Sequence, residues 1–166
     1  DLPDYKGQVA ISNKFGNILL NTSNKSEAAV GYGTLYGDMA GSISVIGDVY
    51  KSKAYDLARY INREREIIPI NTIEKAPSAE LRPDQKDSDS LPEYDLLDQI
   101  LFELIENEKA GSEVVAMGFE KSLVERVCKL VNNEEFKRFQ APPILRVSPK
   151  AFGPGRQIPL VAKYPY

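Results

Sequence analysis

The spacing of apolar residues changes along the chain, and this change predicts a mixed α/β domain. Short apolar runs come first, at 18–20 and 43–46, and a polar cluster follows each of them. A short apolar run that ends in turn residues is typical of a buried parallel strand. From 95 to 131, by contrast, leucine, isoleucine and valine recur at the spacing of one buried helix face.

Two strand–turn–helix units occupy the first part of the chain. The run Ile18-Leu19-Leu20 is the first predicted strand, and 21–24 is its polar turn before a helix. The run 43–46 is the second strand, and 49–62 is its helix, with Asp48 as the predicted N-cap. Ligands of open parallel sheets bind at the carboxyl ends of the strands, so both polar turns are expected at a ligand site.

The rest of the chain is predicted to be mainly helical. Helices are expected at 95–108, 119–131 and 134–140, with 110–118 as a linker between the first two. One further strand is predicted at 67–70. It is placed at an edge of the sheet because Pro69 cannot donate a hydrogen bond to a neighbouring strand.

Composition narrows the possible functions. The chain has 166 residues, a net charge of −3, one cysteine and no histidine. The charge argues against a nucleic-acid surface, and no apolar run reaches the roughly 20 residues that span a bilayer. The single cysteine suits a reducing compartment such as the cytoplasm. Without histidine, a metal would need oxygen ligands, which points to magnesium.

Three features each allow a structural and a functional interpretation. Lys51 and Lys53 fall in the first turn of a predicted helix, where the helix dipole disfavours cations. They are either solvated lysines or partners of a phosphate at the helix N-terminus. The glycine-rich stretch 31–41 is either a flexible loop or a backbone that approaches a flat ligand. The stretch 71–92 is either a surface excursion or a mobile lid over substrate, with 78–92 as its most mobile part.

Four runs of the sequence resemble one enzyme family, in the family's order. The longest is TSNKSEAAVGYGTLYGDMAGSISVIGDVYKSKAYDLARYIN at 22–62. The others are IEKAPSAELRPDQKDSDSLPEYDLLDQIL at 73–101, EFKRFQAPP at 135–143 and SPKAFGPGRQIP at 148–159. They resemble the synthetase domain of glutamine-dependent NAD synthetases, which belong to the N-type ATP pyrophosphatases. The resemblance implies a Rossmann-like open parallel sheet with flanking helices, similar to the adenine-nucleotide alpha-hydrolases.

The resemblance also implies a reaction. Enzymes of this family use ATP to adenylate the carboxylate of deamido-NAD, which releases pyrophosphate. Ammonia, supplied from glutamine by a separate glutaminase domain, then attacks the acyl-adenylate and gives NAD and AMP. The resemblance therefore implies ATP as co-substrate, magnesium as the metal, deamido-NAD as substrate and a homo-oligomeric enzyme, without nucleic-acid or membrane partners.

The same resemblance assigns roles to individual residues. It implies that ATP is contacted by Thr22, Lys51 and Ser78. It implies that deamido-NAD is contacted by Glu27, Tyr32, Gly33, Thr34, Leu35, Asp38 and Lys137, with Glu27 also beside magnesium. It assigns no catalytic residue.

The chain also departs from the family's pattern. It lacks the Ser-Gly-Gly-x-Asp-Ser run of the ATP-pyrophosphatase loop and the amidohydrolase domain that releases ammonia. Residues 1–166 are therefore expected to be the C-terminal portion of one synthetase domain, truncated on its N-terminal side and inactive alone. The alternative is a non-catalytic nucleotide-binding or interaction module, which composition and periodicity fit equally well.

Overall fold

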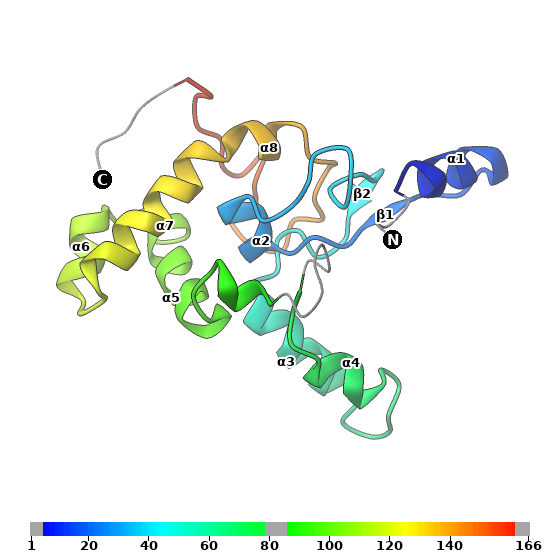
Figure 1. Ribbon diagram of the computed structural model, residues 1–166, viewed down its shortest axis with the longest axis horizontal. Coiled ribbons are helices and arrows are strands. Elements are labelled where there is room, and N and C mark those ends of the chain that lie inside the picture. The colour runs from blue at the N-terminus through cyan, green and yellow to red at the C-terminus, as the bar shows by residue number, and fades with distance from the viewer. Residues whose placement is uncertain (1–4, 79–85, 162–166) are drawn as a thin grey trace.

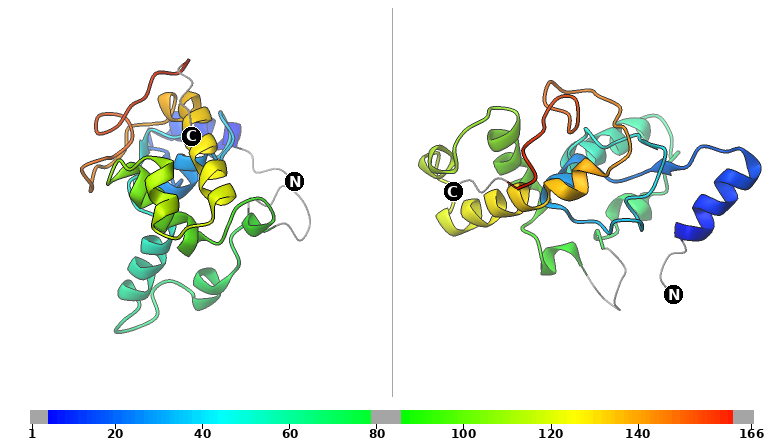
Figure 2. Two further views of the ribbon diagram at one scale, coloured as in Figure 1. Left: turned by 90° about the vertical axis from the view of Figure 1, so that its left-hand side faces the viewer. Right: turned by 90° about the horizontal axis from the view of Figure 1, so that it is seen from above.

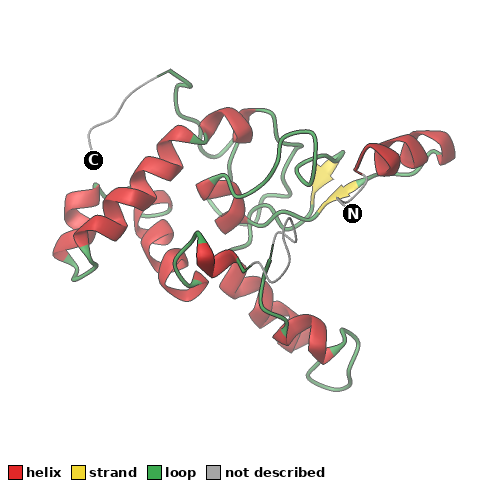
Figure 3. Ribbon diagram, in the orientation of Figure 1, coloured by secondary structure: helices red, strands yellow, loops and turns green. Residues whose placement is uncertain are grey.

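The structure, a computed structural model, describes residues 5–78 and 86–161 (Figure 1). Helices make up most of the described elements, and the short strands lie toward α1 at one end of the molecule (Figure 3). In chain order the elements are α1 (Tyr5–Phe15), β1 (Leu20–Asn21), α2 (Lys25–Val30), β2 (Ile43–Ser44), α3 (Lys51–Ile61), α4 (Ile70–Glu74), the 3-10 helix η1 (Asp87–Asp89), α5 (Tyr94–Ile105), α6 (Gly111–Ala116), α7 (Lys121–Asn133) and α8 (Glu135–Phe139).

The two predicted strand–turn–helix units are present. β1 and β2 pair in parallel, with Leu20 opposite Ile43 and Asn21 opposite Ser44. Ser44 also makes a parallel bridge with Ile144, which brings the segment after α8 to the same place. Because β1 leads into α2 and β2 leads into α3, the starts of these two helices lie at the carboxyl ends of adjacent strands.

The prediction that 18–20 forms a buried strand is wrong. β1 covers only Leu20 and Asn21, and the side chains of Ile18 and Leu20 are 71% and 53% exposed. The helices that follow the strands pack on α5 and on each other instead. Among the described residues, no element therefore covers the apolar run.

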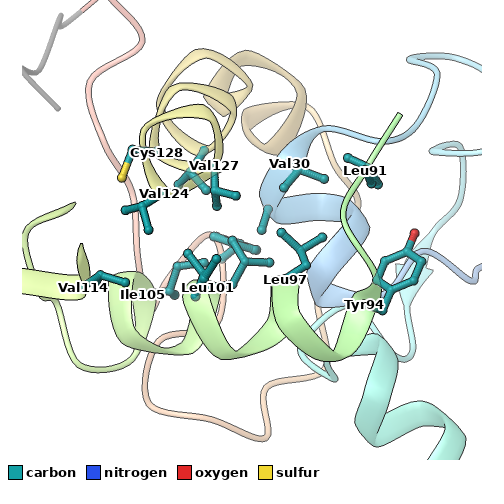
Figure 4. Close-up of a cluster of buried hydrophobic side chains, with 14 residues drawn as sticks. Val30, Leu91, Tyr94, Leu97, Leu101, Ile105, Val114, Val124, Val127 and Cys128 are labelled. Carbon is teal, nitrogen blue, oxygen red and sulfur yellow. The ribbon is translucent and has the colours of Figure 1, made fainter. Parts of the chain in front are cut away.

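The hydrophobic core lies between α5, α7 and α2, as Figure 4 shows. The helical spacing predicted most of this face: Leu97, Ile100, Leu101 and Ile105 of α5 are fully buried, whereas Leu96, which the same spacing included, is 38% exposed. Val124 and Val127 of α7 face them. Burial of each such side chain is worth about 1.5–3 kcal/mol. α2 and α3 both contact α5, so the most buried helix supports the two helix starts, while α3 and α4 extend away from the core (Figure 2).

Residues 67–70 do not form the predicted strand. Ile67 and Ile68 donate their backbone N–H groups to the side-chain oxygen of Asn62, at 3.0 and 2.9 Å. The Asn62 amide nitrogen donates to the carbonyl of Ile68 in return. Because one side chain satisfies these backbone groups, the segment needs no partner strand. Pro69 then fixes a backbone φ of −52° just before α4.

Residues 110–118 are not the predicted linker either, because they contain α6. The Glu113 carboxylate accepts the backbone N–H of Ala110 at 2.7 Å, which holds the first turn of this helix. Val114 is fully buried against the core. One buried valine and one capping glutamate in six residues are too weak a pattern to predict a helix from the sequence. Packing of α6 against α7 stabilises it in the fold.

Candidate functional site

The start of α2 fixes the position of Glu27. Asn24 is the N-cap, and its side-chain oxygen accepts the backbone N–H of Glu27 at 3.0 Å. Oε2 of Glu27 accepts the backbone N–H of Asn24 in return, at 3.1 Å. This reciprocal capping box satisfies two backbone donors. It leaves Oε1 of Glu27 directed toward the start of α3.

The start of α3 is capped by side chains from other elements. Its N-cap, Tyr50, makes no side-chain cap. Instead, the Ser26 hydroxyl accepts the backbone N–H of Lys51 at 2.8 Å. Oδ2 of Asp98, from α5, accepts the backbone N–H of Ser52 at 2.9 Å. Protein groups therefore occupy the first amides of this helix, which the sequence suggested for a phosphate.

The prediction that Asp48 caps this helix is wrong. Its carboxylate accepts the Lys25 ammonium at 2.7 Å and the backbone N–H groups of Val147 and Ser148 at 2.7 and 2.5 Å. Burial alone would raise the pKa of Asp48, but these hydrogen bonds outweigh it and hold the pKa below the ordinary value. Asp48 therefore anchors the segment after α8, not the helix that follows it in the chain.

Lys51 and Glu27 meet between the two helix starts. The Lys51 ammonium lies 3.0 Å from Oε1 of Glu27, and the two side chains are 21% and 18% exposed. The ammonium also lies 5.4 Å from the ring centre of Tyr94. The charge of Lys51 is thus balanced by a neighbouring carboxylate that solvent and a ligand can reach. This partly open pair of opposite charges is the candidate site.

Tyr94 connects this pair to the predicted lid. Its hydroxyl donates to Oδ2 of Asp87 in η1 at 2.8 Å. Burial, the charge of Glu27 and this hydrogen bond raise the pKa of Tyr94 above its ordinary value, so it remains a neutral donor. Residues 79–85 of the predicted lid lie outside the described residues. In its later part, Asp87 and Leu91 are buried, which ties that part to the core.

Helix α8 holds the other end of α2. The Lys137 ammonium donates to the carbonyl of Gly31 at 2.6 Å and lies 3.0 Å from Glu134. Arg138 is buried and donates to the carbonyls of Ala28 and Ala29. Cations are favoured at a helix C-terminus, where carbonyl groups lack partners. In this structure, Lys137 therefore supports the helix that carries Glu27.

Comparisons with known proteins show which family the chain belongs to. A family model described as NAD synthase matches residues 5–141, which is most of the chain. The chain belongs to the NAD synthase family. The glutamine-dependent NAD(+) synthetase of Synechocystis sp. is 51% identical over 156 residues, or 94% of this chain and 28% of that protein. That of Acinetobacter baylyi is 52% identical over 155 residues, or 92% of this chain and 29% of that protein. The chain thus spans less than a third of the length of the curated relatives that it matches.

Solved structures of the family share the fold. The crystal structure of a glutamine-dependent NAD(+) synthetase from Cytophaga hutchinsonii matches 96% of this chain and 27% of that chain, with a TM-score of 0.69 at 22% identity. The NH3-dependent NAD synthetase from Campylobacter jejuni in complex with the nitrate ion matches 85% of this chain and 50% of that chain, with a TM-score of 0.60 at 29% identity. These likenesses confirm the Rossmann-like α/β fold expected for NAD synthases.

Only some of the residues predicted for the NAD synthase site come together. Glu27, Tyr32 and Gly33 line one small pocket with the strand ends. The Asp38 carboxylate accepts the backbone N–H of Thr34 at 2.6 Å and so shapes the glycine-rich turn. The other predicted residues, which line neither this small pocket nor a larger cleft along α3 and α5, are Thr22, Leu35, Lys51, Ser78 and Lys137.

A larger cleft of about 1280 Å³ runs along α3 and α5. Tyr94 and Asp98 line it together with Lys53 and Tyr55. Neither Lys51 nor Glu27 lines this cleft. Although the cleft is larger than the small pocket, it is therefore not taken as the candidate site. The charges and the strand ends favour the Lys51–Glu27 pair instead.

Sequence reasoning missed a fully buried lysine in this NAD synthase chain. The Lys25 ammonium contacts the carboxylates of Asp48 and Glu106 and the Ser148 hydroxyl, which lies at 2.8 Å. It also lies 5.3 Å from the ring centre of Tyr50. Its partners are distant in sequence. The local sequence shows only that Lys25, like Lys51, is the first residue of a helix. Within 5–78 and 86–161, no helix is both long and apolar enough to cross a membrane.

Proposed function

We propose that this chain works within a glutamine-dependent NAD synthetase, which converts deamido-NAD to NAD with ATP and ammonia. The observation that carries the proposal is the Lys51–Glu27 pair, 3.0 Å apart at the carboxyl ends of two parallel strands. Relatives of that name are 51% and 52% identical to the chain. Parallel α/β sheets bind their ligands at this edge.

The proposed reaction requires negative oxygens to be held close together. A carboxylate oxygen of deamido-NAD attacks the α-phosphorus of ATP, and the bond to pyrophosphate breaks. Ammonia nitrogen then attacks the acyl carbon, the bond to AMP breaks, and the nitrogen loses a proton. Lys51 would neutralise charge on the ATP phosphates. The Tyr94 hydroxyl, held by Asp87, would keep the later part of the proposed lid against this site.

Glu27 is the residue that would hold magnesium. Among the described residues, no three acidic, cysteine or histidine side chains gather to hold a metal ion by themselves. Magnesium commonly binds one or two carboxylates together with phosphates and water, so a single carboxylate beside a phosphate site fits this ion. When bound, it would neutralise the phosphates and orient them.

The finer assignments belong to the same proposal. Thr22 and Ser78 would contact ATP. The deamido-NAD contacts would come from Glu27, Tyr32, Gly33, Thr34, Leu35, Asp38 and Lys137. For Lys137, a ligand phosphate would have to compete with Gly31 and Glu134. The partners would be ammonia from a glutaminase domain and further copies of the enzyme, in the cytoplasm.

Two lysines in the same helical turn provide a matched test. Lys51→Met in the full-length protein should lower kcat/KM for ATP by about 100- to 1,000-fold, as loss of an electrostatic donor does. Lys53→Met should leave it unchanged, since the Lys53 side chain is 71% exposed and, within the described part of the chain, its ammonium pairs with Asp56. The assay is NAD formation from deamido-NAD, ATP and ammonia. Absence of NAD formation by the wild-type protein would favour a non-catalytic nucleotide-binding module.

A further inference from the structure

Asp98 is joined to the residues beside both members of the candidate pair. Its Oδ1 accepts the Ser26 hydroxyl at 2.5 Å, and Ser26 precedes Glu27. Its Oδ2 accepts the backbone N–H of Ser52 at 2.9 Å, and Ser52 follows Lys51. One carboxylate on α5 therefore connects the start of α2 with the start of α3.

Ser26 completes this connection. Its hydroxyl donates to Asp98 and accepts the backbone N–H of Lys51 at 2.8 Å. Both side chains are withdrawn from solvent, with Ser26 fully buried and Asp98 6% exposed. A buried hydroxyl that both donates and accepts has a fixed orientation, because any rotation would leave a polar group unpaired.

The carboxylate at this position has no neutral equivalent. Asp98 uses both oxygens as acceptors, from a hydroxyl and from the first turn of α3. A negative charge at that end also suits the helix dipole. Asparagine would keep the shape but replace one acceptor by a donor, and would then face either the Ser26 hydroxyl or the Ser52 N–H.

The buried neighbours of Asp98 on α5 hold this part of the helix in place against the core. Leu97 and Leu101 are fully buried in the core. Burial raises the pKa of Asp98, while the Ser26 and Ser52 hydrogen bonds oppose that shift. The pKa of Asp98 stays above its ordinary value, and the two helix starts that Asp98 joins favour its charged form against this burial. If either moved away, Asp98 would lose an acceptor bond that supports its charge.

We propose that Asp98, together with Ser26, is a positioning residue that sets the separation between Glu27 and Lys51 for ATP. The inference rests on the proposed function, since it deepens the account of the same site. Neither residue needs to contact substrate. Displacement of a reacting or binding group by about 1 Å can lower a rate about 100-fold.

The test uses a matched pair of substitutions on α5 in the full-length protein. Asp98→Asn should lower kcat/KM for ATP by about 10- to 100-fold, through a lower kcat together with a higher KM for ATP. Asp95→Asn is an identical change at an exposed position of the same helix; it removes a charge that raises the pKa of Asp98 but no hydrogen bond to either helix start, so kcat/KM should stay close to the wild-type value. Ser26→Ala should resemble Asp98→Asn, and it serves as the second variant if Asp98→Asn does not fold. Wild-type kcat/KM in folded Asp98→Asn or Ser26→Ala would overturn the proposal.

A second measurement separates positioning from general destabilisation. In a Lys51→Met background, Asp98→Asn should cause no further loss of kcat/KM, because the group that it positions is absent. A full additional loss would mean that Asp98 acts elsewhere and would overturn the proposal.

Calorimetric titration with magnesium-ATP tests the inference apart from turnover. If the wild-type protein binds ATP but makes no NAD, the proposed reaction fails, and weaker ATP binding by Asp98→Asn still supports positioning. Equal binding by the two proteins would overturn it.

Discussion

Two lysines begin adjacent helices of this molecule, yet their surroundings differ. Lys25 starts α2 and Lys51 starts α3, each soon after a parallel strand. Lys25 is fully buried between two carboxylates and a hydroxyl. Lys51 is 21% exposed and, in the part of the chain that the structure describes, contacts one carboxylate, that of Glu27. The same residue type at the same kind of position is thus enclosed by the protein in one case and partly exposed to solvent in the other.

The difference follows from where the partners come from. Lys25 joins α2 to Glu106 after α5 and to Ser148 in the C-terminal segment. A buried charge must have such partners, because it has no water to replace them. Lys51 has solvent access and a partner that is already fixed by the capping box of α2. Under the proposed function, the ATP phosphates would compete with Glu27 for the Lys51 ammonium.

The largest change in the free energy of unfolding is expected when the buried lysine, Lys25, is replaced. Lys25→Met should lower the free energy of unfolding by about 3–5 kcal/mol, because it leaves the buried Asp48 and the partly buried Glu106 without their cation. Urea unfolding of the chain measures this loss. Lys53→Met is the control and should stay within about 0.5 kcal/mol of the wild type. A loss below about 1 kcal/mol for Lys25→Met would contradict a structural role.

The stabilisation that Asp48 provides in the same region should depend on pH. Asp48→Asn should lower the free energy of unfolding at pH 7 by about 1.5–3 kcal/mol, since the carboxylate binds an ammonium. The folded pKa lies below the ordinary 3.8, so this stabilisation is present above that pH and is lost as pH falls through the folded pKa. The difference between wild type and variant should therefore shrink in acid. A difference that grows in acid would refute this interpretation.

A smaller effect is expected at the opposite end of α2. Gly31 has a backbone φ of 68°, and a Cβ there would collide with the Glu134 side chain. Gly31→Ala should lower the free energy of unfolding by about 1–2 kcal/mol, the strain of a left-handed alanine. Urea unfolding again provides the measurement. An unchanged free energy of unfolding would mean that α8 does not hold α2 as described.

The elements that were predictable are those whose signal is local. Apolar spacing identified α5 and α7, and the polar turn at 21–24 identified the capped start of α2. The run at 67–70 misled because Asn62 binds its backbone. Apolar character alone cannot distinguish a strand from such a turn.

The site was only partly predictable for a similar reason. Lys51 and Glu27 could be identified from the resemblance, but the short distance between their charged groups is known only from the folded structure. The anchoring groups Asp98 and Arg138 contact residues about 70 to 110 positions away, and no spacing rule in the sequence indicates such pairs. Residues that only support a site leave weaker sequence signals than residues that form it.

The most direct test is the thermal unfolding of the full-length protein with and without magnesium-ATP. A ligand at 100 times its Kd stabilises a protein by about 2.7 kcal/mol, which raises the Tm. Lys51→Met should unfold close to the wild-type temperature without ATP but lose the rise that ATP causes, whereas Lys53→Met should keep that rise. A Lys51→Met protein that unfolds at a much lower temperature without ATP, yet keeps the full rise with ATP, would contradict the account.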